Sequence, residues 1–160
     1  MKMMILLRGV ALVLAVLLVM TLVLTSCGKT EKTDPSNDLP SVAAGEAGLQ
    51  ELMEMIHLLP VGTMGVSVHA TDIAFRALNW CKDTTMTSFE ISDTVTAHLA
   101  SLEGAEWELF AEQLDLVGAC CYNLYEAETR ESSLAMLGIE NADFGWTEDT
   151  IDKAVSLTSY

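Results

Sequence analysis

The sequence WELFAEQLDLVGACCYNLY, residues 107–125, contains the clearest helical pattern in the chain. Apolar side chains recur in it every three or four residues, which is the spacing of one buried face of an α-helix. Glu108, Glu112 and Asp115 lie on the opposite side, where they would meet water. The pattern therefore predicts a helix with one face in a protein core. That face comprises Trp107, Phe110, Ala111, Leu114, Val117, Gly118, Cys121, Leu124 and Tyr125.

Similar patterns predict three main helices before this one. The first ends at Pro60, and the second spans about residues 63–82. The third begins with a capping box, in which Thr87 and Glu90 bond to free backbone N–H groups, and is expected to end at Gly104. The buried stripes of the first and third helices are Leu49, Leu52, Met53, Ile56 and Leu59, and Ile91, Val95, Leu99 and Leu102.

Two weaker patterns follow the long helix. A short helical piece ends near Gly138, and Thr147 is a suitable cap for a last helix that carries Ile151 and Ala154. We therefore predict an all-α fold, a small up-down helical bundle of about four main helices with a C-terminal helical appendage. A strand over residues 89–95 is the alternative for part of the third helix.

The charge of the chain restricts its partners. Its 160 residues include 8 Lys and Arg against 23 Asp and Glu, a net charge of −15, and residues 41–160 alone carry −16. Nucleic-acid binding is disfavoured, because such a surface needs Lys and Arg side chains to replace the counterions of the phosphates.

The first 26 residues have a different composition from the rest. They contain no acidic residue, two basic residues, Lys2 and Arg8, and an apolar run at residues 9–24. A basic start followed by an apolar stretch is typical of an export signal. The run of 16 residues is shorter than the roughly 20 that a membrane-spanning helix needs, so a cleaved signal is favoured over a permanent span.

The sequence Leu24-Thr25-Ser26-Cys27 resembles the lipobox of bacterial lipoproteins. The resemblance covers residues 1–27 and implies that the Cys27 thiol receives a diacylglyceryl group, that residues 1–26 are cleaved off, and that the new N-terminus often receives a further chain such as palmitate. Two or more acyl chains make a stable membrane anchor, whereas one chain gives marginal binding. Gly28 leaves the choice between inner and outer membrane open.

These observations divide the chain into three parts. A signal peptide occupies residues 1–26, and a lipidated tether occupies residues 27–40, which are polar, contain two prolines and are expected to be disordered. Residues 41–160 form the acidic helical domain.

The three remaining cysteines, Cys81, Cys120 and Cys121, are an odd number for an exported chain. A disulfide from Cys81 to Cys120 or Cys121 is geometrically possible if the helices that carry these cysteines run parallel. The favoured interpretation for Cys121 is a reduced core side chain, because it falls on the apolar stripe.

The histidines and their neighbours provide the candidate ligand site. His57 and His98 are expected near helix C-termini, as caps or surface residues, and no two of the three histidines have the H-x-x-x-H spacing of a metal-binding pair. His69, Asp72 and Arg76 share one side of the second helix and are the best candidate ligand pocket, since they combine a base, a carboxylate and an anion-binding guanidinium.

The sequence favours a non-enzymatic lipoprotein without cofactors, lipid-anchored on the extracytoplasmic side of a bacterial membrane. Its helical domain is expected to bind a protein partner in the cell envelope. The alternative is a solute- or metal-binding accessory lipoprotein with a pocket near His69, Asp72 and Arg76. A partner-binding module would show an exposed apolar patch, whereas a ligand carrier would show a closed cavity with polar groups.

Overall fold

The computed structural model describes residues 39–62 and 66–160, and the proposed signal peptide and Cys27 lie outside these residues. The described part contains six α-helices and no strand, which confirms the predicted all-α bundle and excludes the strand over residues 89–95. The helices are α2 (Gly45–His57), α3 (Val66–Asp83), α4 (Ser88–Ala100), α5 (Ala105–Tyr125), α6 (Ala127–Leu137) and α7 (Glu148–Thr158).

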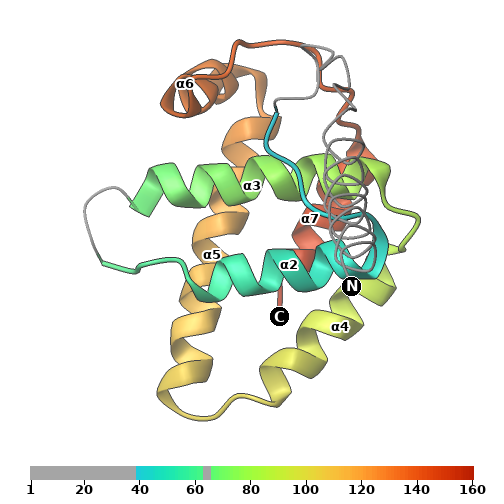
Figure 1. Cartoon of the computed structure of the whole chain (residues 1–160), viewed down its shortest axis with the longest axis vertical. Coiled ribbons are helices and arrows are strands. Elements are labelled where there is room, and N and C mark those ends of the chain that lie inside the picture. The colour runs from blue at the N-terminus through green and yellow to red at the C-terminus, as the bar shows by residue number, and fades with distance from the viewer. Residues whose placement is uncertain (1–38, 63–65) are drawn as a thin grey trace, which may run out of the picture. The chain divides into compact units, whose positions relative to one another are not determined.

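The helices α3 and α5 form the centre of the bundle. They share the most extensive contact between any two helices, and each also packs against α2, α6 and α7. In Figure 1, α2 and α3 lie side by side, whereas α5 crosses them instead of running alongside. The arrangement is therefore a bundle with a crossed helix pair, and the helices are not all aligned up and down.

The predicted apolar face of α5 is buried over most of its length, from Phe110 to Leu124. Trp107 is an exception, because it lies in the first turn of α5 and is 39% exposed, with its ring edge-on to Tyr160. Gln113 is a second exception, since a polar side chain on this face is fully buried.

The last helix belongs to the core and is no peripheral appendage. Ala154 and Leu157 of α7 are fully buried, and α7 packs against α3, α4 and α5. Gly118 of α5 leaves room for this packing, because an added Cβ would lie 2.8 Å from Thr158 Oγ1. The aromatic side chains of the preceding loop, Phe144 and Trp146, pack edge-on against Phe75 of α3.

Three helix ends are as predicted and one is not. Thr87 begins α4 with a capping box to Glu90, Gly138 ends α6 in the left-handed conformation, and Thr147 begins α7 with its side chain accepting from the Thr150 N–H. Gly104, expected to end the third helix, instead precedes α5 with φ +55°, and α4 already ends at Ala100. Glycine adopts a positive φ without steric strain, so Gly104 forms the turn into α5 rather than the end of α4.

The capping box of α4 predicts an acid-sensitive contribution to stability. Hydrogen bonds from Thr87 lower the pKa of the exposed Glu90 carboxyl below its usual 4.5. A carboxyl group with a lowered pKa stabilises the fold above its unfolded pKa, and that stability is lost as the pH falls through the folded pKa. Glu90→Ala should therefore lower the melting temperature at pH 7, and the difference from wild type should shrink below about pH 4.5. Glu112→Ala on α5 is the control, and a Glu90→Ala deficit that does not change with pH would contradict the prediction.

Candidate functional site

The structure places the three predicted pocket residues on α3 but gives them different roles. Arg76 Nε donates to Asp72 Oδ2 over 3.0 Å, as the spacing predicts, and Arg76 Nη1 donates to the Ser41 carbonyl over 2.9 Å. The guanidinium thus holds the chain segment before α2 against α3. His69 is exposed one turn before Asp72.

His69 and Asp72 line a groove between α3 and the C-terminal end of α2. The groove has a volume of about 420 Å³ and is open to solvent on one side, and Arg76 is not part of its wall. Most of the wall is apolar, and Leu58 at its edge is 82% exposed. The remaining lining residues are Met55, Leu59, Pro60 and Ile73. Two of the three predicted residues thus line this groove, and its apolar side chains come from α2 (Met55), from α3 (Ile73) and from residues 58–60 after α2.

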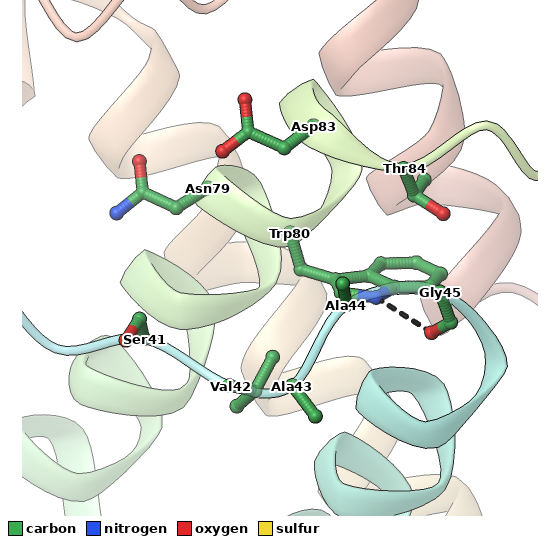
Figure 2. Close-up of a pocket in the computed structure, with 9 residues that line it drawn as sticks. All are labelled: Ser41, Val42, Ala43, Ala44, Gly45, Asn79, Trp80, Asp83 and Thr84. Atoms are coloured by element: carbon green, nitrogen blue, oxygen red, sulfur yellow. Dashed lines mark hydrogen bonds between the residues drawn. The ribbon is translucent and has the colours of Figure 1, made fainter.

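A second, smaller pocket of about 140 Å³ lies between residues 41–45 and the end of α3. Figure 2 shows that Trp80 forms one wall, with its indole Nε1 donating to the Gly45 carbonyl over 2.9 Å. Asn79 and Asp83 project away from the Trp80 ring in this view. The pocket therefore offers few polar groups that converge on a ligand.

His57 and His98 come together where α2 and α4 end. Their Nε2 atoms are 2.6 Å apart, and both rings contact Phe110 of α5. Burial has the largest effect on the pKa of His57 and lowers it. The neighbouring His98 lowers this pKa further, whereas Glu106 raises it. The helix positions agree with the sequence prediction, but the two histidines form a contact across the bundle and are not separate surface residues.

Gln113 is a functional candidate that sequence reasoning missed. Its Nε2 donates to the carbonyls of His57 and Leu59 over 3.0 and 2.7 Å, so it binds the last turn of α2. Its Oε1 is buried and has no hydrogen-bond partner among the described residues. The signal in the sequence was its position, since residue 113 lies three residues after Phe110 on the buried face.

The three cysteines of the described residues are free thiols, so the disulfide between Cys81 and Cys121 is not formed in this structure. Burial raises the pKa of Cys81 to about 12 and that of Cys121 well above its usual value. Burial also raises the pKa of Cys120, whose sulfur accepts from the Thr71 hydroxyl at 3.6 Å. Because the thiolate is the reactive form, these thiols are poor nucleophiles at neutral pH.

Among residues 39–62 and 66–160, no group of three or more His, Cys, Asp or Glu side chains is arranged to hold a metal ion. Over the same residues, no helix is both long and apolar enough to cross a membrane. No family model, curated protein or solved structure matches the chain.

Proposed function

We propose that the chain is a bacterial lipoprotein, anchored through Cys27 on the extracytoplasmic side of a membrane, whose helical domain binds a protein partner. The anchor is supported by the basic start, the apolar run at residues 9–24 and the lipobox-like sequence that ends at Cys27. The strongly acidic domain would be repelled by anionic lipid headgroups, so attachment rests on the lipid and leaves the domain accessible to proteins.

The exposed Leu58 at the edge of the apolar groove carries the proposal of partner binding. A large aliphatic side chain that is 82% exposed beside an apolar wall gains free energy when a partner covers it. Asp72 adds a carboxylate to the groove, and the domain around it has a net charge of −16. Charge complementarity therefore favours a protein segment with apolar and basic side chains.

The same groove also supports the alternative, a solute-binding accessory lipoprotein. Its volume falls in the range of small-molecule sites, and His69 and Asp72 supply two polar groups. Two features make this the second choice. The groove is open rather than closed around a ligand, and Arg76, the predicted anion-binding group, is occupied by Asp72 and Ser41.

A pair of matched variants tests partner binding. The full chain, produced in its own bacterium, is cross-linked in intact cells as wild type, Leu58→Asp and Phe89→Asp. Phe89 is similarly exposed, at 79%, but lies on α4 outside the groove. We expect the cross-linked protein partner of wild type to persist with Phe89→Asp and to fall at least about tenfold with Leu58→Asp, since a buried charge in the interface is costly.

Equal loss or equal retention in the two variants would contradict the groove as the binding surface. The solute alternative has its own readout, which is the thermal stability of the purified chain with small acids and sugars. A ligand at 100 times its dissociation constant stabilises by about 2.7 kcal/mol. A stabilisation of this size in wild type that is lost in His69→Ala would favour the solute-binding alternative.

A further inference from the structure

We propose that His57 and His98 form a binding site for a divalent transition-metal cation such as Zn²⁺ or Cu²⁺. The two Nε2 atoms face each other at 2.6 Å across the junction of α2 and α4. Neither histidine lines the groove described above, so this site does not depend on the proposed protein partner. The sequence did not predict it, because the two residues are 41 positions apart.

The two rings are held in place before any cation arrives. His57 stacks on the Phe110 ring, with centroids 4.1 Å apart and an angle of 19° between the planes. His98 meets the same ring edge-on at 5.1 Å and meets His57 edge-on at 4.9 Å. Gln113 fixes the backbone of His57 through its carbonyl. These contacts keep the two imidazole rings next to each other in the folded chain.

The electrostatic surroundings also favour a cation. His57 is the last residue of α2 and His98 lies in the last turn of α4, so the negative ends of two helix dipoles point toward the pair. Glu106, in the first turn of α5, is near enough to act on the charge of His57. The net charge of −16 over residues 41–160 raises the local concentration of cations further.

The ligand chemistry selects the class of cation. Imidazole nitrogens suit Zn²⁺, Cu²⁺ and Ni²⁺, whereas Mg²⁺ and Ca²⁺ prefer oxygen ligands. A Zn–N distance of about 2.0–2.1 Å with tetrahedral angles requires nitrogens about 3.3 Å apart. The Nε2 atoms now meet head-on, with ring centroids 4.9 Å apart, so the two rings must both separate and turn for their lone pairs to reach one cation. Both side chains are only half-buried, which allows this movement.

The protein supplies two ligands, and water completes the coordination shell. This follows from the finding that the described residues contain no cluster of three ligand side chains. Without the cation, one ring must donate its Nε2 proton to the other; with the cation, that ring carries its proton on Nδ1. The result is an exchangeable site, open at two or more positions, rather than a closed structural one.

The test is equilibrium dialysis of the full chain, purified in detergent without a polyhistidine tag, against Zn²⁺, Cu²⁺ and Mg²⁺ at neutral pH. The variants are His57→Phe and His98→Phe, which keep an aromatic ring at Phe110 but remove the nitrogen ligands. The control is Tyr122→Phe, a change of an exposed aromatic side chain on α5 that does not line the groove. We expect wild type and Tyr122→Phe to bind one Zn²⁺ or Cu²⁺ per chain. Each of the other two variants should lose at least about tenfold in affinity.

Magnesium serves as the probe for nonspecific attraction to the acidic surface, and its binding should be equal in all four proteins. Circular dichroism at the temperature of the dialysis verifies that each variant is folded. The paramagnetic resonance spectrum of bound Cu²⁺ should show coupling to two nitrogens in wild type and to one in the single variants. Equal Zn²⁺ binding by wild type, His57→Phe and His98→Phe, or a loss of the same size in Tyr122→Phe, would overturn the proposal.

Discussion

Replacing Leu114 by alanine should lower the free energy of unfolding by about 2–5 kcal/mol. Leu114 is fully buried at the middle of α5, the helix that contacts most of the others. The substitution removes apolar contacts and leaves a cavity, and the crossed arrangement of α3 and α5 limits how far the neighbours can move to fill it. Chemical denaturation of the full chain in detergent, monitored by circular dichroism, measures the change.

The matched control is Leu109→Ala, which makes the same substitution on the same helix. Leu109 is 46% exposed, so its truncation should cost much less than that of Leu114. Because helix propensity changes equally in both variants, the difference isolates burial. Equal unfolding midpoints for the two variants would show that this face of α5 is not in the core.

The sequence was sufficient for the features that depend on neighbouring residues. The spacing from Phe110 to Leu124 predicted the buried face of α5, and the pair Thr87 and Glu90 predicted the start of α4. Such signals are local, because a helix period and a cap involve residues within one or two turns. The ion pair between Asp72 and Arg76 was predictable for the same reason.

Features that depend on how helices cross were not predictable. The contact between His57 and His98 requires the ends of α2 and α4 to meet at Phe110, and sequence spacing does not specify that meeting. The second bond of Arg76, to Ser41, also joins segments 35 residues apart. In the structure α5 packs against both α2 and α4, and Phe110 of α5 contacts both histidine rings.

The proposed membrane anchor gives the second large expected effect. When the chain is expressed in bacteria, Cys27→Ala should abolish its labelling by radioactive palmitate and should leave the uncleaved precursor, which is 26 residues longer than the proposed mature form. In lipoproteins the cysteine sulfur carries the diacylglyceryl group, and this group is attached before the signal peptide is cleaved. Gel mobility and palmitate labelling measure these two consequences.

Cys120→Ala is the matched control, since it removes a thiol that lies on α5, half-buried, and outside the lipobox. It should be cleaved and labelled like wild type. The two variants together distinguish lipid on Cys27 from acylation at another thiol. Because the Cys27 thiol and the N-terminus that cleavage would create at Cys27 are the proposed acylation sites, Cys27→Ala should remove the label entirely. A Cys27→Ala product of mature size that still carries palmitate would mean that residues 1–27 do not act as a lipoprotein signal.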